Sequence, residues 1–156
     1  MPFGVWAFRW CSMVLIPMTS YASLAALTAE HNVVTAARSL KARPVYFTTE
    51  ELQAVAAECV PAGRKATAER YLYEIHGEVI PPSEYLDRVF GLDLVIQYRG
   101  WIIGLDVTLD PQALAAKQRK QAYLAGAYSR LGLDKWGVIV APCPDLKATL
   151  SAIIKG

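Results

Sequence analysis

Two aspartates are the only charged residues inside two otherwise apolar strand runs of this chain, and this pattern limits what the chain can fold into. Asp93 lies in the run 92–96 and Asp106 in the run 101–108, with a turn sequence at 98–100 between them. The two runs therefore predict a β-hairpin. Because a carboxylate buried without a partner is costly, we expect the acids to converge across the strands and to suit a hard divalent cation. The alternative is that they are strand-end acids that face solvent or cap a turn.

The composition is that of a globular protein with a real core. Of the 156 residues, 54% are hydrophobic and 19% are charged, which excludes a disordered chain and fits one domain with a modest extension. The net charge of +2 is uninformative, but residues 111–135 carry five cations against the single acid Asp134. This local surplus suits a phosphate-facing patch, although a solvated helix face would show the same pattern.

The cysteines and histidines do not form a metal-binding pattern. Cys11, Cys59 and Cys143 are odd in number and widely separated, so neither a disulfide framework nor a zinc site is predicted. We therefore expect a reducing, cytoplasmic location. His31 and His76 are isolated, and His76 directly before a glycine suits the C-terminus of a helix.

The first 18 residues are predicted to be a hydrophobic extension. Their apolar stretch is interrupted by Arg9, stopped by Pro17, and shorter than the about 20 residues that a membrane span needs. We therefore expect no membrane span here. A weak signal peptide is the alternative for this segment.

Helical periodicity and capping residues predict the remaining elements. Thr48-x-x-Glu51 is a capping box, and Asp110-Pro111 is a strong helix start. We expect helices over 20–41, 48–58, 66–76, 83–88, 111–131 and 145–154, a short strand at Val79-Ile80, and a strand over 136–141. The apolar run of this last strand suits a central, parallel position covered on both faces. Residues 19–60 then form N-terminal helices, and residues 61–156 form an α/β core.

This order of elements, with acids at these places, resembles the core of the PD-(D/E)XK nuclease superfamily over roughly residues 63–141. Asp93 matches the aspartate of the family's first motif, and Asp106, thirteen residues later, matches the acid of its second. Glu69, ahead of Gly77, matches a glutamate of the family's first helix. The resemblance implies a restriction-endonuclease-like core, in which helices flank a central mixed four-stranded sheet, with an extra N-terminal helical region.

The chain departs from the family pattern at two positions. Thr108 stands where the family has a lysine two residues after the second acid, and Leu92 stands where a proline is usual. Some family members carry the lysine on the following helix instead. By that resemblance we expect Lys117 to take its place, with Lys120 as the second choice, although both could be plain solvated charges.

The resemblance implies a Mg²⁺-dependent (or Mn²⁺-dependent) nuclease that hydrolyses phosphodiester bonds of DNA, with RNA as a less favoured substrate. Asp93, Asp106 and the Val107 carbonyl would bind the metal. The other catalytic roles would fall to a lysine, to Glu69 and to Thr108, whose hydroxyl can bond a water or a phosphate. The side chains expected to contact the nucleic acid are Arg64, Lys65, Arg70, Lys117, Arg119, Lys120 and Gln121.

Two other functional classes remain open. The threonine at position 108 favours a nuclease-like fold that has lost catalysis and serves as a nucleic-acid-binding or protein-interaction module. The hydrophobic N-terminus is also compatible with a small α/β interaction protein that packs on a partner. The family resemblance also makes a homodimer a candidate assembly, because many nucleases of the family cut both strands as dimers.

Overall fold

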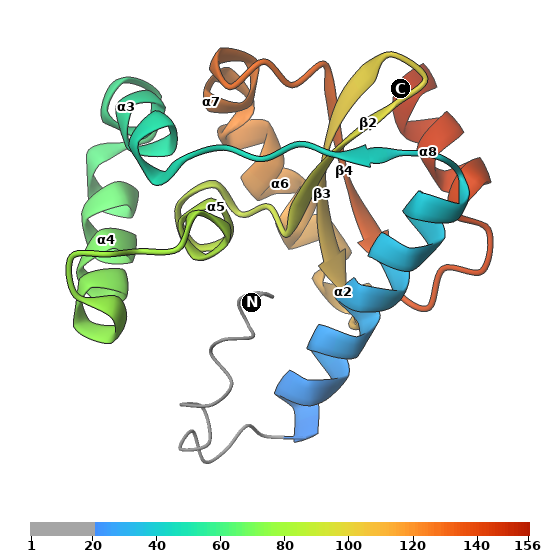
Figure 1. Ribbon diagram of the computed structural model, residues 1–156, viewed down its shortest axis with the longest axis horizontal. Helices are drawn as coiled ribbons and strands as arrows, with labels where there is room; N and C mark the ends of the chain where they lie inside the picture. Colours follow the sequence, from blue (N-terminus) through green and yellow to red (C-terminus); the bar gives the residue numbers. More distant parts are fainter. Residues whose placement is uncertain (1–20) are drawn as a thin grey trace.

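The structure, a computed structural model that describes residues 21–156, contains a four-stranded mixed sheet (Figure 1). Its strands, in spatial order, are β1 (Arg43–Pro44), β2 (Leu94–Tyr98), β3 (Trp101–Thr108) and β4 (Lys135–Val140). β2 pairs antiparallel with both β1 and β3, whereas β4 pairs parallel with β3. The α/β class and the mixed four-stranded sheet are therefore confirmed. The extension expected over residues 1–18 lies outside the described residues.

Helices and two apolar cores flank the sheet (Figure 1). One core involves α2 (Tyr21–Ser39) and α8 (Leu146–Lys155). The other involves α3 (Thr49–Cys59), α4 (Ala62–His76), α5 (Pro82–Phe90) and α7 (Ala125–Arg130), and a short 3-10 turn (Pro111–Ala113) leads into α6 (Leu114–Tyr123), which packs on β4. None of the helices within residues 21–156 has the length and apolar character needed to cross a membrane.

The predicted hairpin of β2 and β3 is confirmed. A tight turn at Arg99 and Gly100 joins the strands, and their φ angles of 53° and 84° lie in the left-handed region that two-residue hairpin turns of this kind require. Leu94 pairs with Leu105, which sets the register of the two strands. The turn thus brings the start of β2 beside the end of β3, where the two aspartates lie.

The side chains of β3 alternate between the two faces of the sheet. Ile103, Leu105 and Val107 are buried in the core that α2 and α8 share. Alternation therefore directs Asp106 and Thr108 to the opposite face, and both are buried, with exposed fractions of 3% and 9%. The second acid consequently lies on the face where α6 crosses from β3 to β4.

The local signals for helix starts are confirmed. The Thr48 hydroxyl accepts from the Glu51 N–H, and the Glu51 carboxylate accepts in return from the Thr48 N–H at 2.8 Å. Asp110 caps the turn before α6 by accepting from the Gln112 N–H. Asp145 caps α8 in the same manner.

The short strand predicted at Val79-Ile80 is wrong. Ile80 is buried and its carbonyl accepts from the Thr49 hydroxyl at 2.7 Å, while Val79 is 83% exposed. Two prolines follow, and proline has no N–H to offer a sheet. The fourth strand is instead β1, whose Arg43 and Pro44 give no apolar alternation to read.

Two other expectations need correction. The parallel pairing of β4 is confirmed, but β4 lies at an edge of the sheet rather than in a central position. Its apolar run is explained by α6 and α8, which both contact it. The helix expected over 111–131 is interrupted at Leu124, where ψ of 6° separates α6 from α7.

Tyr128→Phe should lower the free energy of unfolding by about 1–2 kcal/mol, because it leaves a buried carbonyl without its donor. The Tyr128 hydroxyl donates to the Phe90 carbonyl at 2.7 Å, and the side chain is fully buried. Tyr123→Phe is the matched control, since that ring is 64% exposed. Urea denaturation measures both variants, and equal losses of stability would contradict the assignment.

Candidate functional site

Asp93 is fixed against the end of β3 by two hydrogen bonds. Its backbone N–H donates to the Leu105 carbonyl at 2.8 Å, and its carboxylate accepts from the Val107 N–H at 2.6 Å. The side chain is partly buried. Because strand and carboxylate are held together, the position of this acid is set by the hairpin.

Asp106 lies in β3 and contacts two lysines of α6. The same carboxylate oxygen accepts from Lys117 Nζ at 3.3 Å and from Lys120 Nζ at 3.2 Å. Lysines three residues apart share a helix face, and this face is turned toward β3. Both lysines proposed from the sequence therefore reach the second acid.

The two aspartates converge. Leu94 pairs with Leu105, so the register of the hairpin places Asp93 opposite Asp106, and the charge of Asp106 helps to raise the pKa of Asp93. The alternative in which the acids face solvent does not hold for Asp106, which is buried, whereas Asp93 lies directly before β2 and is partly buried.

Glu30 of α2 joins the pair, and the sequence interpretation missed it. Burial and the negative charge of Asp87 raise the pKa of Glu30 to about 7, while a hydrogen bond with Asp93 acts in the opposite direction. Glu30 is the sole acid in α2, whose other residues are mostly apolar or small. That isolation is the signal that could have identified it.

The cluster holds more negative than positive charge. Burial, followed by the charges of Glu30, Asp87 and Asp106, raises the pKa of Asp93 well above its ordinary value of 3.8. Both effects disfavour the charged carboxylate. A cation placed among these oxygens would relieve that repulsion.

Asp87 of α5 is a fourth acid near the cluster. Burial among protein atoms raises its pKa, the Arg88 guanidinium lowers it, and the carboxylate of Glu84 raises it further. Its side chain nonetheless lies at the surface and is exposed to solvent. Water at the surface weakens such effects, so we treat Asp87 as a neighbouring charge and not as part of the site.

The oxygen atoms present fit a hard divalent ion. The carboxylates of Glu30, Asp93 and Asp106 are of the type that Mg²⁺ prefers. The Val107 carbonyl adds to them, because the N–H and C=O of one strand residue point to the same side and the Val107 N–H points to Asp93. Within residues 21–156, however, no three or more His, Cys, Asp or Glu side chains are placed so that together they could hold a metal ion. A bound ion would have to bring the carboxylates of Glu30, Asp93 and Asp106 closer together.

Lys120 reaches Asp106 across Gly91, the residue that ends α5. A Cβ at this position would lie 2.7 Å from Cε and 2.9 Å from Nζ of Lys120. Gly91 also has a φ of 68°, which favours glycine. The absence of a side chain at this residue therefore leaves the path of the lysine open.

Thr108 and Glu69 are engaged in local contacts. The Thr108 hydroxyl accepts from the Asp110 N–H at 3.1 Å. Glu69 accepts from the Tyr85 hydroxyl at 2.5 Å and from Lys65 at 3.0 Å, and the structure does not bring it into contact with either aspartate. Glu30, and not Glu69, lies beside Asp93.

Of the residues expected to contact nucleic acid, some are exposed and others are already bonded within the protein. Arg70 and Arg119 are exposed. Arg64 Nε donates to the Val89 carbonyl, and Lys65 pairs with Glu69. Gln121 is 4% exposed and its amide donates to the Gly137 carbonyl, so it ties α6 to β4.

A comparison of this chain with protein-family models, with curated proteins and with solved structures finds no match. The site must therefore be interpreted from its own residues. Those residues are acids from α2, from the position directly before β2 and from β3, and two lysines of α6 contact the acid of β3.

Asp93→Asn should raise the free energy of unfolding by about 1 kcal/mol or more at pH 8 in a chelating buffer. The amide still accepts from the Val107 N–H but removes a carboxylate whose charge is disfavoured by its neighbours. For an acid with a raised pKa in the folded state, stability is lost as the pH rises above 3.8.

The gain from Asp93→Asn should therefore be small at pH 4 and grow toward pH 8. Chemical denaturation across this range measures it. Asp134→Asn, at an exposed acid that accepts from the Ile102 N–H, is the control and should show no such gain. A gain that is the same at both pH values would contradict the proposed electrostatic cause.

Proposed function

We propose that this protein is a Mg²⁺-dependent (or Mn²⁺-dependent) nuclease that hydrolyses phosphodiester bonds of DNA. The observation that supports it best is the contact of a buried aspartate with two lysines beside a second, converging acid. Carboxylates that bind a metal and an ammonium that faces a phosphate are the groups this hydrolysis requires.

Asp93, Asp106, Glu30 and the Val107 carbonyl would hold the metal ion. When bound, such an ion lowers the pKa of a coordinated water and neutralises charge that develops on the phosphate. The protein contributes the geometry, since Asp93 is oriented by the Val107 N–H and Asp106 by its position in β3. These contacts fix both acids before any substrate arrives.

The lysines of α6 would supply the positive charge that Thr108 cannot. Lys117 and Lys120 are partly exposed, with 28% and 26% of their side-chain surface open to solvent. A phosphate beside Asp106 would therefore meet an ammonium group directly. One lysine is sufficient to orient Asp106, which leaves the other to stabilise charge on the phosphate.

The topology is compatible with a restriction-endonuclease-like core. An antiparallel hairpin carries the acids, and a helix crosses from it to a parallel strand, which is the order the family resemblance implies. Two departures accompany the resemblance: α3, α4 and α5 separate β1 from β2, and the helical glutamate comes from α2. The first departure changes the connection between two strands, and the second changes the helix that carries the glutamate. Neither alters the hairpin of β2 and β3.

A binding module without catalysis is the second candidate. The observation that favours it is that both lysines pair with one carboxylate, which neutralises part of the pocket. In such a protein the exposed Arg70 and Arg119 would still contact phosphates. The two candidates differ in whether single-acid substitutions change cleavage or leave only binding to be measured.

Asp93→Asn, Asp106→Asn and Glu30→Gln should each reduce Mg²⁺-dependent cleavage of labelled DNA by about 100-fold or more. Glu69→Gln should retain activity, because its contacts lie outside the site. Glu58→Gln, at an exposed acid, is the surface control. The assay uses single-stranded, duplex and RNA substrates in Mg²⁺, Mn²⁺ and a chelator.

The outcomes separate the candidates. Loss of cleavage in Glu69→Gln but not in Glu30→Gln would overturn the assignment of the helical glutamate. Intact substrates in every divalent salt, combined with salt-sensitive DNA binding that falls in Lys117→Ala and Lys120→Ala, would replace the nuclease by the binding module.

Mg²⁺ or Mn²⁺ should raise the melting temperature of the wild type by about 3–6 °C at a free concentration near ten times its dissociation constant. The physical reason is that the ion binds the folded acids and relieves their repulsion. Asp106→Asn should abolish most of this shift, and Asp134→Asn should leave it intact. Differential scanning fluorimetry measures it, and an equal shift in both variants would place the ion elsewhere.

A further inference from the structure

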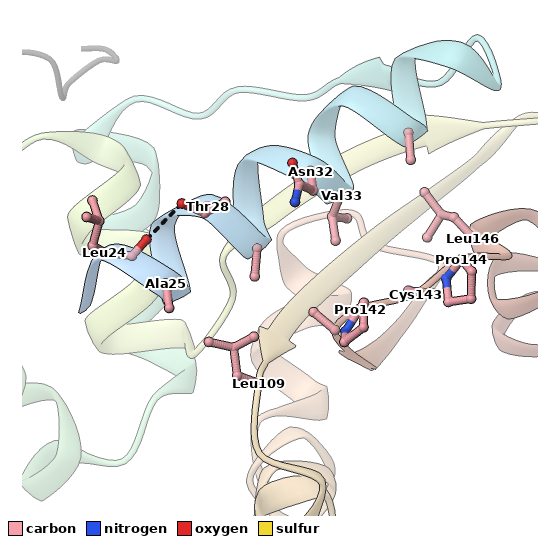
Figure 2. Close-up of a pocket in the computed structure, with 13 residues that line it drawn as sticks. Leu24, Ala25, Thr28, Asn32, Val33, Leu109, Pro142, Cys143, Pro144 and Leu146 are labelled. Carbon is pink, nitrogen blue, oxygen red and sulfur yellow. Dashed lines mark hydrogen bonds between the residues drawn. The ribbon is translucent and has the colours of Figure 1, made fainter. Parts of the chain in front are cut away.

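An apolar groove lies beside the first turns of α2, on the side of the sheet opposite α6 (Figure 2). Its cavity volume is about 690 Å³. Its walls come from α2, from the residue after β3, from the segment after β4 and from the start of α8, and they include Leu24, Ala25, Val33, Leu109, Pro142 and Leu146. The Thr28 hydroxyl already donates to the Leu24 carbonyl at 3.0 Å, so Asn32 is the main polar side chain left on the α2 wall.

Large apolar side chains at the rim of the groove are open to solvent. Leu24 is 55% exposed and Leu109 is 43% exposed. The N-terminal turns of α2 extend past the end of β3 (Figure 1), so this stretch of the helix has less of the sheet beneath it. Contiguous apolar surface of this kind marks a place where another apolar segment binds.

We propose that residues 5–16 of this same chain occupy the groove. Apart from Arg9 and Ser12, this stretch is apolar, and it includes two tryptophans and a phenylalanine. Four residues separate its end from Tyr21, where α2 begins. At about 3.3–3.6 Å per extended residue, that link can turn back onto the neighbouring Leu24.

The covalent link makes this occupant stronger than an outside partner. An attached segment binds at a high effective concentration and does not lose the translational freedom that a separate molecule would. Docking here would also hold the first turns of α2, the helix that carries Glu30. The proposal does not depend on nuclease activity, because its evidence is the groove and the apolar sequence.

The natural cysteines provide a direct test on the full chain. Cys11 lies within the proposed segment, Cys143 lines the groove, and Cys59 lies elsewhere, in α3 beside Arg130. A short bifunctional maleimide should link Cys11 to Cys143 within one chain, in preference to Cys59, as peptide mass spectrometry would show.

Leu24→Asp should reduce the Cys11–Cys143 link by about tenfold, because a charge at the rim disfavours apolar contact. Ile75→Asp is the matched control, since Ile75 is 53% exposed on α4 and away from the groove. It should leave the yield unchanged.

Trypsin gives a second measurement that does not depend on cysteine reactivity. Arg9 is the only lysine or arginine before Arg38. Cleavage after Arg9 should be slow in the wild type, about tenfold faster in Leu24→Asp, and unchanged in Ile75→Asp.

Three results would overturn the proposal. The first is equal linking of Cys11 to Cys59 and Cys143, together with equal cleavage rates in all variants. The second is a link that forms only between chains, which would assign the groove to a second copy. The third is a difference between Leu24→Asp and wild type that appears only with phosphatidylcholine vesicles, which would assign it to a lipid surface.

Discussion

The site depends on one hydrogen bond at the end of the hairpin, from the Val107 N–H to the Asp93 carboxylate at 2.6 Å. The bond fixes the first acid against the strand that carries the second. Because β2 and β3 are joined by a two-residue turn, their register is set locally, and the convergence of the acids follows from it. Without this bond, Asp93 would be a carboxylate at the start of a strand with no fixed direction.

The charges around this bond come from separate parts of the chain, and keeping the buried carboxylates charged costs free energy. Glu30 belongs to α2, Asp93 and Asp106 to the hairpin, and the two lysines to α6. Mutual repulsion and burial raise the pKa of Glu30 and Asp93, so the folded protein keeps a group that disfavours its own charged state. Such arrangements concentrate at functional sites. An acid retained in this way is more readily explained by a ligand than by stability.

Much of the site could be predicted from the sequence because its main parts are local. The aspartates lie on two strands joined by a short turn, and alternation places them without any tertiary information. Glu30 precedes Asp93 by 63 residues, so only the packing of α2 shows that they meet. Glu69 satisfied the expected spacing, but its partner is the Tyr85 hydroxyl, which no spacing rule reveals. β1 was missed because two residues carry no periodicity.

In the proposed nuclease, the lysines of α6 would supply the positive charge that the family resemblance leads one to expect on β3. Electrostatic stabilisation depends on where an ammonium lies relative to the phosphate and not on which element carries it. Position 108 carries a threonine, and the ammonium groups that contact Asp106 come instead from Lys117 and Lys120 of α6. The long lysine side chain needs an open path, which Gly91 provides for Lys120. The helix α2 supplies both Glu30 and a wall of the apolar groove. A segment that binds in the groove would therefore also affect the position of Glu30 beside Asp93.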